Sequence, residues 1–505
     1  MIILTPGTVT LDQLRALWSG TAARLSDASL TAIDAAAASV DRIVAGGTTV
    51  YGINTGFGLL AQTRIPADKL ADLQRNLILS HSCGLGQALP RHVTRLMIIL
   101  KLIGLGRGHS GVRREVIDAL MALLDADAMP VIPSQGSVGA SGDLAPLAHM
   151  VAALMGEGRI DLAGTDLPAA EALKKIGREP LVLAPKEGLA LINGTQASTA
   201  IALDALVLGQ RVFDAAIHAG ALSVDALKGS VAPFDQRIHA LRGQPGQIEV
   251  AARLRALLDG SDINASHCHH DCDRVQDPYS FRCQPQVMGA CLDLLTNAAH
   301  TLEIEANAVT DNPILFPATD EVISGGNFHA QPVAFAADII SMALCEVGSI
   351  SERRTSVLVD PHMSHLPAFL TDDGGVNSGL MIPQVTAAAL VSENKCLAFP
   401  ASVDSIPTSA GQEDHVSMAP FAARKAVTIA NNAAGVIAIE LIAAAQGVDY
   451  HAPLKTSAPL QALHAQIRAL SPHLETDRYL ADEMAALQAA VLAGEMGKPF
   501  SSLRA

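Results

Sequence analysis

Charged and aromatic side chains are scarce in this sequence of 505 residues, at 17% and 3% respectively. No run of Lys or Arg occurs, and the formal net charge at pH 7 is −15. Nucleic acids are bound through clusters of basic residues, so we expect no nucleic-acid partner. Because hydrophobic residues account for 49% of the chain, we also expect other copies of the chain to cover part of its surface.

Signals for disulfides, secretion and membrane insertion are also missing. The seven cysteines are an odd number, scattered from Cys83 to Cys396, which is not the pattern of a disulfide framework in a chain of this length. The first residues, Met1 to Pro6, lack the basic segment of a secretory signal. Glu440 and several Gly and His residues interrupt the longest apolar runs, so no run reaches the roughly 18 residues that a membrane helix needs. We therefore expect a cytoplasmic protein with no membrane partner.

One short patch, His267-Cys-His-His-Asp-Cys272, is rich in side chains that bind metal ions. It lacks the paired Cys-x-x-Cys or His-x-x-x-His spacing of the usual zinc sites. The pattern favours a polar loop over a structural metal site, and we predict no metal in the functional site.

Helical periodicity is abundant after the first third of the chain. Apolar residues at Leu295, Ala299, Leu302 and Ala306 follow the spacing of one helix face. The segment Ala433–Ala445 is apolar nearly all round, which predicts a helix buried within a bundle. Alanine-rich helices of this kind pack closely and suit a long bundle.

Strand signals are few and short. Val93–Leu105 predicts another helix, ending at Gly106, and short strands are expected around Thr48–Tyr51 and near Val322–Ser324. No internal repeat at a fixed period is evident, which argues against a solenoid. We predict a mainly α fold with a long central helix bundle and a smaller mixed N-terminal region.

The chain, residues 1–505, is interpreted as one functional unit with two regions. Residues 1 to approximately 200 would form the N-terminal region, and approximately 201–505 the central helix bundle and C-terminal helices. Gly and Pro clusters near 128–142 and 400–411 are expected to form loops that present a site on this rigid scaffold.

The segment Gly136-Ser-Val-Gly-Ala-Ser-Gly-Asp-Leu-Ala-Pro146 carries the most specific chemistry. Its small residues Ala140, Ser141 and Gly142 lie where a loop leads into a helix, with Asp143 as the expected N-cap and the proline in the first helical turn. If the amide nitrogen of Gly142 attacks the carbonyl carbon of Ala140 and two waters are lost, the three residues close into a methylideneimidazolone ring. Glycine allows the close backbone approach that closure needs. Such a ring is a strong electrophile that requires no external cofactor.

Six further segments occur in the order found in a known family. They are Tyr51–Gly58, Leu191–Gln196, Gln276–Arg282, Asp311–Pro313, Gly325–His329 and Gln412–Met418. Together with the ring-forming segment, they resemble the aromatic amino-acid ammonia-lyase and aminomutase family over roughly residues 50 to 450. The resemblance implies a helical oligomer, in which the ring forms from Ala140, Ser141 and Gly142. It also implies a homotetramer with active sites shared between chains and with Ala433–Ala445 buried by partner chains.

The resemblance implies roles for particular side chains. Tyr51 matches the family's catalytic tyrosine and would remove the β-proton of the substrate. Arg282 would bind the substrate carboxylate, because its guanidinium fork matches a carboxylate bidentately. Asn193, Gln276 and Tyr279 would orient the substrate or the ring through hydrogen bonds.

The implied reaction is the elimination of ammonia from an α-amino acid. The ring would draw electron density from the C–N bond while a base removes the β-proton, and Phe328 would pack beside the ring. Ser80 and His81 match the pair found in family members that act on histidine, and Glu413 stands where members that act on phenylalanine or tyrosine usually carry an amide. A carboxylate accepts an imidazole N–H, so His81 and Glu413 together imply L-histidine as the substrate and trans-urocanate as the product.

The sequence leaves other functions open. The chain could be a tyrosine or phenylalanine ammonia-lyase, or an aminomutase that returns the amine to the β-carbon; the substrate positions argue less firmly against the mutase. Ser82–Cys83 and Gly411 depart from the histidine-specific pattern, which bears on pocket shape. An inactive helical scaffold would have no reason to keep the ring residues together with Tyr51 and Arg282. A lyase of the fumarase and aspartase type is disfavoured because its Gly-Ser-Ser loop is absent.

Overall fold

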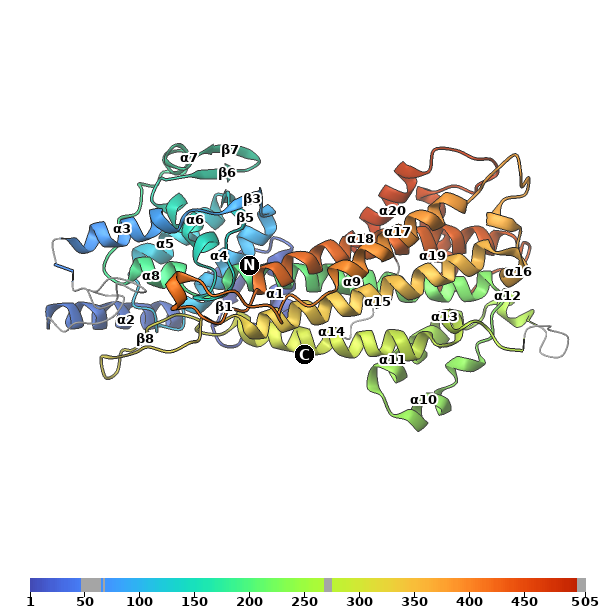
Figure 1. The fold of residues 1–505 in the computed structure, drawn as a ribbon, viewed down its shortest axis with the longest axis horizontal. Coiled ribbons are helices and arrows are strands. Elements are labelled where there is room, and N and C mark those ends of the chain that lie inside the picture. Colours follow the sequence, from blue (N-terminus) through green and yellow to red (C-terminus); the bar gives the residue numbers. More distant parts are fainter. Residues whose placement is uncertain (47–64, 67–68, 268–274, 497–505) are drawn as a thin grey trace.

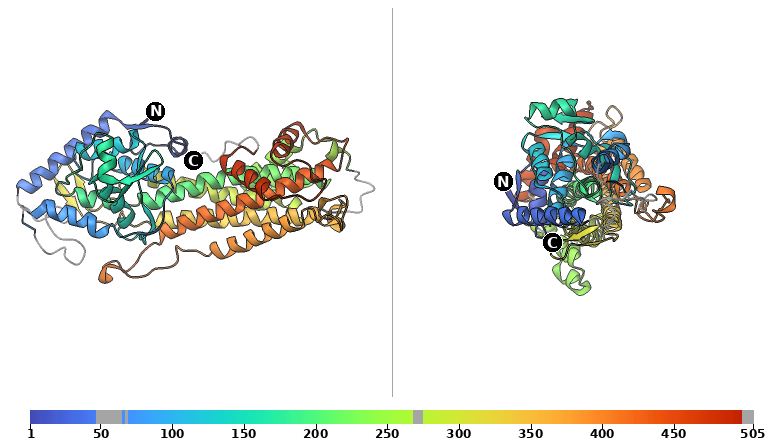
Figure 2. Two further views of the ribbon diagram at one scale, coloured as in Figure 1. Left: turned by 90° about the horizontal axis from the view of Figure 1, so that it is seen from above. Right: turned by 90° about the vertical axis from the view of Figure 1, so that its left-hand side faces the viewer.

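Four long helices lie side by side and form the body of the molecule (Figures 1 and 2). In the computed structural model, which describes residues 1–46, 65–66, 69–267 and 275–496, they are α9 (Gln196–Ala226), α14 (Gln284–Ala306), α15 (Gln331–Val359) and α18 (Ala419–Asp449). Helix α18 packs against both α9 and α15, and α14 packs against α15. The predicted mainly α fold with a long central bundle is confirmed.

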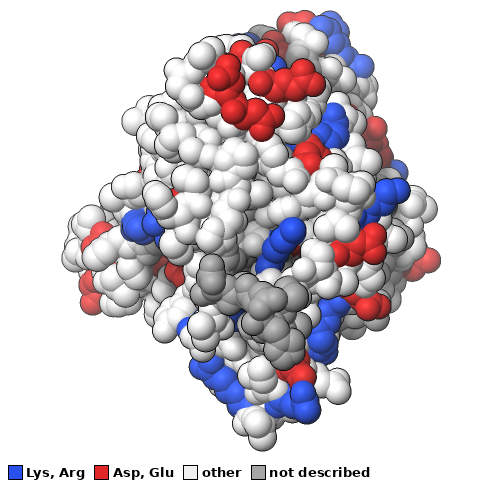
Figure 3. Space-filling view, turned by 90° about the vertical axis from the view of Figure 1, so that its right-hand side faces the viewer, with Lys and Arg blue, Asp and Glu red and all other residues white. Residues whose placement is uncertain are grey.

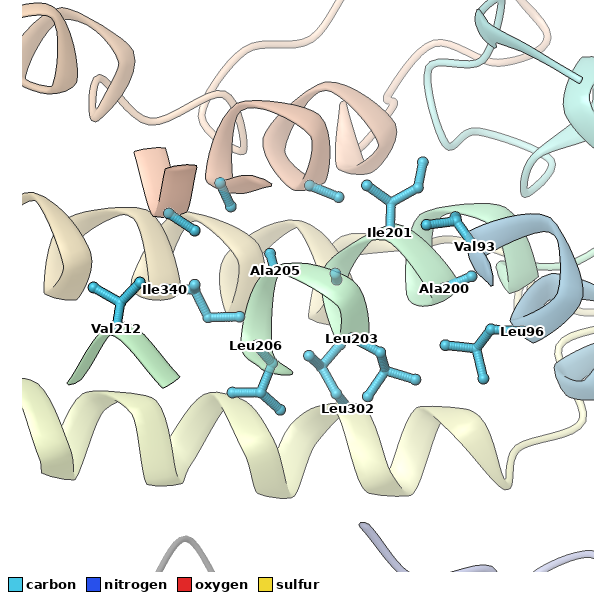
Figure 4. Close-up of a cluster of buried hydrophobic side chains, with 14 of the residues drawn as sticks. Val93, Leu96, Ala200, Ile201, Leu203, Ala205, Leu206, Val212, Leu302 and Ile340 are labelled. Atoms are coloured by element: carbon cyan, nitrogen blue, oxygen red, sulfur yellow. The ribbon is translucent and has the colours of Figure 1, made fainter. Parts of the chain in front are cut away.

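The helix faces that meet inside the bundle are apolar. Leu203 and Leu206 of α9 point toward Leu302 of α14 (Figure 4), and each of the three side chains is at most 2% exposed. The alanines of Ala433–Ala445 in α18 are buried in the same way by the chain's own helices. The expectation that partner chains bury this segment is therefore wrong, because α9 and α15 already cover it.

A charged pair lies inside this apolar interior. Glu440 of α18 accepts hydrogen bonds from Arg354 of α15 at 2.5 and 2.8 Å, from Ser223 of α9 at 2.7 Å and from Ser351 at 2.6 Å. Both charged side chains are fully buried. Removal of one partner of such a pair typically costs about 3–5 kcal/mol, because the other charge is left uncompensated. The pair therefore links three helices at one level of the bundle.

Helices α15 and α18 are long and apolar enough to cross a membrane when judged by length and composition alone. This finding corrects the expectation that no apolar stretch is long enough, which treated single polar residues such as Glu440 as breaks. In the structure, 67% and 72% of their most apolar windows are buried inside the molecule. Such burial is typical of core helices in a bundle.

The N-terminal region packs at one end of the bundle and combines helices with short strands (Figure 1). Its helices are α1 (Leu11–Trp18), α2 (Asp27–Ala45), α3 (Leu70–His81), α4 (Arg91–Leu105), α5 (Arg114–Asp125), α6 (Leu144–Leu154), α7 (Ala169–Lys175) and α8 (Glu187–Ile192). Helix α4 confirms the helix predicted over Val93–Leu105, with Gly106 as its C-cap. The predicted boundary between the two regions, near residue 200, falls within α9. The division of the chain into these two regions stays a prediction.

Short strands pair in four small sheets within the described residues. The strands are β1 (Ile2–Leu4), β2 (Ala23–Leu25), β3 (Leu85–Ala88), β4 (Ala128–Pro130), β5 (Pro133–Gln135), β6 (Arg159–Leu162), β7 (Thr165–Pro168), β8 (Ile314–Phe316) and β9 (Glu321–Ile323). Strands β1 and β2 are parallel, whereas β3–β5, β4–β6–β7 and β8–β9 are antiparallel. Strand β9 confirms the prediction near Val322–Ser324, and the strand expected at Thr48–Tyr51 lies outside the described residues.

The remaining helices surround the bundle, mostly toward its other end (Figure 1). They are α10 (Gln236–Arg242), α11 (Pro245–Leu258), α12 (Asp262–Ala265), α13 (Tyr279–Arg282), α16 (Pro361–Ser364), α17 (Met381–Leu397), α19 (Ala458–Leu470) and α20 (Ala481–Ala493). Helix α11 packs on α14, α17 on α15 and α18, and α20 on α18.

Candidate active site

The ring-forming segment leads from β5 to α6 and turns sharply at a glycine. Gly142 has φ +73° and pairs with Gly194, which has φ +119°. A Cβ atom on Gly142 would overlap the carbonyl oxygen of Gly194, so this contact requires glycine. The backbone N–H of Asp143 donates to the same carbonyl oxygen at 2.7 Å. Gly194 thus fixes the path of the backbone just after Ser141.

Asp143 occupies the N-cap position of α6, but its side chain does not cap that helix. Its carboxylate instead accepts the backbone N–H of Ser198 at 2.7 Å and the Ser198 hydroxyl at 2.6 Å, in the first turn of α9. The predicted N-cap position is therefore confirmed, but the carboxylate makes no capping hydrogen bond to α6, because a helix start 55 residues away takes it. Burial raises the pKa of Asp143, although hydrogen bonds from Ser198 and Ser137 oppose the rise.

Glu413 lies against Ser141 although 272 positions separate them in sequence. The Ser141 hydroxyl donates to Oε1 of Glu413 at 2.5 Å, and the Thr408 hydroxyl donates to Oε2 at 2.6 Å. Burial raises the pKa of Glu413, but hydrogen bonds from Ser141, Thr408 and Ser409, together with the charge of His81, outweigh it and hold the pKa below its usual value. Glu413 is therefore a carboxylate at neutral pH.

His81 reaches the site from the last turn of α3. Its Nδ1 atom lies 2.8 Å from the carbonyl oxygen of Leu77 and 3.0 Å from the Ser80 hydroxyl. Because the charge of His81 contributes to the lowered pKa of Glu413, the two residues predicted to select the substrate share one electrostatic environment.

Asn193 is the C-cap residue of α8, and its side chain is buried. The amide nitrogen donates to the carbonyl oxygen of Asn312 at 2.9 Å and to Oδ1 of Asp311 at 3.4 Å. Asp311 also pairs with the buried Lys186 at 2.9 Å. The Asp311–Pro313 segment directly precedes strand β8, and Asp311 anchors the side chain of Asn193.

Phe328 lies half-buried in the connection between β9 and α15. The backbone N–H of Ala330 donates to the carbonyl oxygen of Gly139 at 3.4 Å, which brings this connection beside the ring-forming segment. Tyr51 lies outside the described residues, so its role as the base stays a prediction.

Three of the predicted substrate-binding residues belong to α13 (Figure 1), at the opposite end of the bundle, or to the cavity beside it. They are Gln276, Tyr279 and Arg282. Their neighbour Asp277 accepts the backbone N–H of Ser230 at 2.7 Å, just beyond the end of α9, whereas Asp143 binds at the start of that helix. Since α9 has 31 residues, it is about 46 Å long. A single chain therefore does not bring these three residues to Ser141.

The guanidinium of Arg282 is not fully hydrogen-bonded by the described residues, as expected of a side chain that binds a ligand. Its guanidinium lies 4.5 Å from the ring centre of Tyr279, which is 70% exposed. Among the described residues, the buried Nε atom of Arg282 has no hydrogen-bond partner. Arg282 and Gln276 also line a cavity of about 610 Å³. Figure 3 views this end of the molecule, where uncharged surface separates scattered acidic and basic side chains.

Comparison with known families decides the relationship. The sequence matches the model of the family described as aromatic amino acid lyase over residues 9–469. The chain belongs to the aromatic amino acid lyase family. It is therefore a carbon–nitrogen lyase, as the resemblance implied.

Relatives of this aromatic amino acid lyase cover nearly its whole length. A histidine ammonia-lyase of Burkholderia pseudomallei (strain 668) is 60% identical over 486 residues, which make up 96% of each chain. The crystal structure of histidine ammonia-lyase from Trypanosoma cruzi has a TM-score of 0.89 at 42% identity and covers 96% of this chain and 92% of its own. Tyrosine aminomutase from Streptomyces globisporus has a TM-score of 0.91 at 35% identity, covering 97% and 96%.

The residues of this lyase fit the internal ring that the sequence predicts. Gly142 makes a backbone contact that excludes any side chain, and Ala140 before it is buried. No metal is implied by the described residues, among which no group of three or more His, Cys, Asp or Glu side chains could hold an ion. The Cys268–Cys272 part of the histidine-rich patch lies outside them, so the predicted polar loop stays untested.

Two residues that shape the site were not predicted from the sequence. Thr408 binds Glu413, and its only sequence signal is its position shortly before the Gln412–Met418 segment. Lys101 is buried and donates to the carbonyl oxygen of Asn193 at 2.7 Å. Its signal is clearer, because it is the one charged residue in the apolar stretch 96–106.

Proposed function

We propose that this protein eliminates ammonia from L-histidine without oxidation and releases trans-urocanate, the first step of histidine degradation. The observation that carries the proposal is the Glu413 carboxylate, which lies against Ser141 with His81 nearby. A carboxylate accepts an imidazole N–H and stabilises a charged imidazole, whereas it is a poor neighbour for a phenyl ring. The 60% identity to the Burkholderia histidine ammonia-lyase supports the same substrate.

The electrophile in this proposal comes from the chain itself. A 5-methylidene-imidazol-4-one formed autocatalytically from Ala140, Ser141 and Gly142 supplies an acceptor for the substrate amine, so no external cofactor is needed. Tyr51 removes the β-proton, which requires a phenol pKa lowered from about 10 by nearby positive charge or helix N-termini. The Glu413 carboxylate holds the imidazole so that the β-carbon faces that base.

The remaining residues bind the substrate. Arg282 binds the carboxylate with two parallel hydrogen bonds. Asn193, Gln276 and Tyr279 orient the substrate through hydrogen bonds, and Phe328 forms an apolar wall. Asn193 suits this role because Asp311 and its neighbours already fix its side chain.

We propose that the protein works as a homotetramer whose active sites combine residues of different chains. Arg282 and Ser141 lie at opposite ends of α9 in one chain, so a complete site needs another chain to supply Arg282. Exposed apolar side chains support assembly, since Phe335 of α15 is 50% exposed and Ile382 of the adjacent α17 is 61% exposed. Large apolar side chains gathered on neighbouring helices are typical of interfaces. We place the enzyme in the cytoplasm, with a small molecule as its only other partner.

An aminomutase is the second candidate. The likeness to tyrosine aminomutase, at 35% identity over 97% of this chain, favours it. A mutase would return the amine to the β-carbon and release a β-amino acid. The product therefore separates the two functions.

The test is an ultraviolet assay of the purified protein with L-histidine, L-tyrosine and L-phenylalanine, with the products identified by mass. We expect urocanate from histidine, and kcat/KM at least about 100-fold lower for the other two, because a site built for a polar group rejects analogues that lack it. The intact chain should weigh two waters less than its sequence, and Ser141→Ala should keep both waters and lose nearly all activity. A preference for tyrosine would overturn the substrate assignment, and full activity at full sequence mass would overturn the ring.

A further inference from the structure

A buried lysine holds the backbone that supports the ring-forming loop. Lys101 projects from α4 and is 2% exposed. Its Nζ atom donates to the carbonyl oxygen of Asn193 at 2.7 Å and to that of Ala190 at 3.2 Å. Both carbonyls lie at the C-terminal end of α8, where the helix cannot satisfy them itself. A cation at this end also meets the negative pole of the helix dipole.

Two carboxylates of the active site act electrostatically on Lys101. Burial lowers the pKa of Lys101 to about 7, the negative charges of Asp311 and Asp143 act in the opposite direction, and Lys186 adds to the lowering. Asp311 anchors the Asn193 side chain, and Asp143 directly follows Gly142. The ammonium group is thus linked electrostatically to both sides of the contact between Gly142 and Gly194.

Gly194 is the residue of this arrangement whose backbone conformation most needs to be held by its neighbours. It has no side chain to restrict its backbone, and its φ of +119° is one that few residues adopt. Lys101 holds the carbonyl of the preceding residue, and the hydroxyl of Thr310 accepts the N–H of the following residue, Thr195, at 3.3 Å. Gly194 then presents the carbonyl oxygen that binds the N–H of Asp143.

We propose that Lys101 is a positioning residue for active-site maturation: by holding the carbonyls of Ala190 and Asn193, it fixes Gly194 in the conformation that sets the turn at Gly142, and so speeds ring closure. The inference rests on the proposed ring. It concerns how fast the ring forms, and it assigns Lys101 no contact with the substrate.

The experiment follows the mass of newly made full-length chains. Wild type and Lys101→Met are synthesised without cells, translation is stopped, and intact mass is measured at intervals. Folded chains are identified by their resistance to protease. We expect folded Lys101→Met chains to lose the two waters at least roughly ten-fold more slowly than wild type, because two buried carbonyls lose their donor and the turn is no longer held.

Lys425→Met is the matched control. Lys425 is also a buried lysine, and it donates to the carbonyl of Phe399 and pairs with Asp338 at 2.6 Å. We expect this variant to lose the waters as fast as wild type. The inference is overturned if Lys101→Met matures at the wild-type rate, if Lys425→Met is equally slow, or if Lys101→Met does not fold at all, which would assign Lys101 to fold stability. A wild-type chain that keeps both waters would instead overturn the proposed ring.

Discussion

Both oxygens of the Glu413 carboxylate accept a hydroxyl group, from Ser141 on one side and Thr408 on the other. These bonds favour the charged form and also fix the direction in which the carboxylate points. After the Ser141 hydroxyl leaves as water, Oε1 would be free to accept a donor from the substrate. Thr408 would still hold the other oxygen in place.

Replacement of Glu413 by glutamine tests this view. Glu413→Gln keeps the size of the side chain but removes the negative charge that stabilises an imidazole ring. We expect kcat/KM for histidine to fall by about 100-fold or more, while the chain still weighs two waters less than its sequence. Kinetics and intact mass measure the two effects separately. Unchanged histidine kinetics would contradict the assignment of Glu413 to the substrate.

The lowered pKa of Lys101 predicts how stability varies with pH. The pKa falls from 10.5 to about 7 on folding, so between these values the unfolded chain binds one more proton than the folded chain. Wild-type stability should therefore rise with pH in this window, by up to about 1.4 kcal/mol per pH unit relative to Lys101→Met. Urea unfolding of both proteins at pH 6, 7, 8 and 9 and at one protein concentration measures the difference. Parallel pH curves would show that Lys101 does not titrate there.

At the scale of elements, the active site is built from the ends of helices and the turns between them. The turn that carries Glu413 is an example: Thr408 and Glu413 pair through their backbones, and Ser409, Ala410 and Gly411 between them all have positive φ, from 50° to 84°. Two of these three residues are not glycine, so the turn is strained and is held by the pairing at its ends. Such a turn fixes the direction in which the Glu413 side chain points.

The end of α3 offers the matching test of specificity. We expect Ser80→Phe combined with His81→Leu to raise kcat/KM for phenylalanine relative to histidine by about ten-fold or more, because an apolar edge would then meet an apolar wall. The kinetics of the double variant with both amino acids measure the shift. The Glu413→Gln variant serves as the comparison, since it lowers histidine turnover without adding apolar surface. No change in the ratio would exclude the end of α3 from substrate selection.

The sequence predicted the elements better than the contacts between them. Periodic apolar residues such as Leu295 and Leu302 predict α14 correctly, because apolar residues recur on the helix face that packs against the core. The placement of Ser141 and Glu413 in one site came only from family resemblance, and their direct contact was not predicted, since no local pattern spans 272 positions. The binding of the Asp143 carboxylate to Ser198 of α9 could not be predicted for the same reason. Lys101 could have been suspected from its apolar neighbours, but its carbonyl partners are visible only in the fold.

At the scale of the whole molecule, the chain carries two halves of an active site at its two ends. The half with Ser141, Glu413 and His81 lies at the end of the bundle where the N-terminal region packs. The half with Gln276, Tyr279 and Arg282 lies at the other end of α9, a helix about 46 Å long. Apolar side chains exposed on α15 and α17 provide a surface through which chains can assemble.

Mixed oligomers test the sharing of sites. Ser141→Ala and Arg282→Met should each be nearly inactive alone. When equal amounts are produced together, chance assembly should give about a quarter of the sites an intact Ser141 from one chain and an intact Arg282 from another. We therefore expect activity to return to about a quarter of the wild-type value in the mixture, with light scattering to confirm tetramers. No recovery in tetramers containing both variants, or a fully active monomer, would contradict shared sites.

The placement of a half-site at each end of α9 constrains how the sequence can change in length. One residue inserted within α9 would rotate everything beyond it by about 100° and move it by about 1.5 Å. Asp143 and Asp277 would then no longer hold their present orientations relative to each other, and the faces toward α14, α15 and α18 would lose their register. Insertions and deletions are therefore expected to be confined to the connections outside the bundle, while each of the four long helices keeps its own length. We therefore expect the number of residues in α9 to vary less than the identity of those residues.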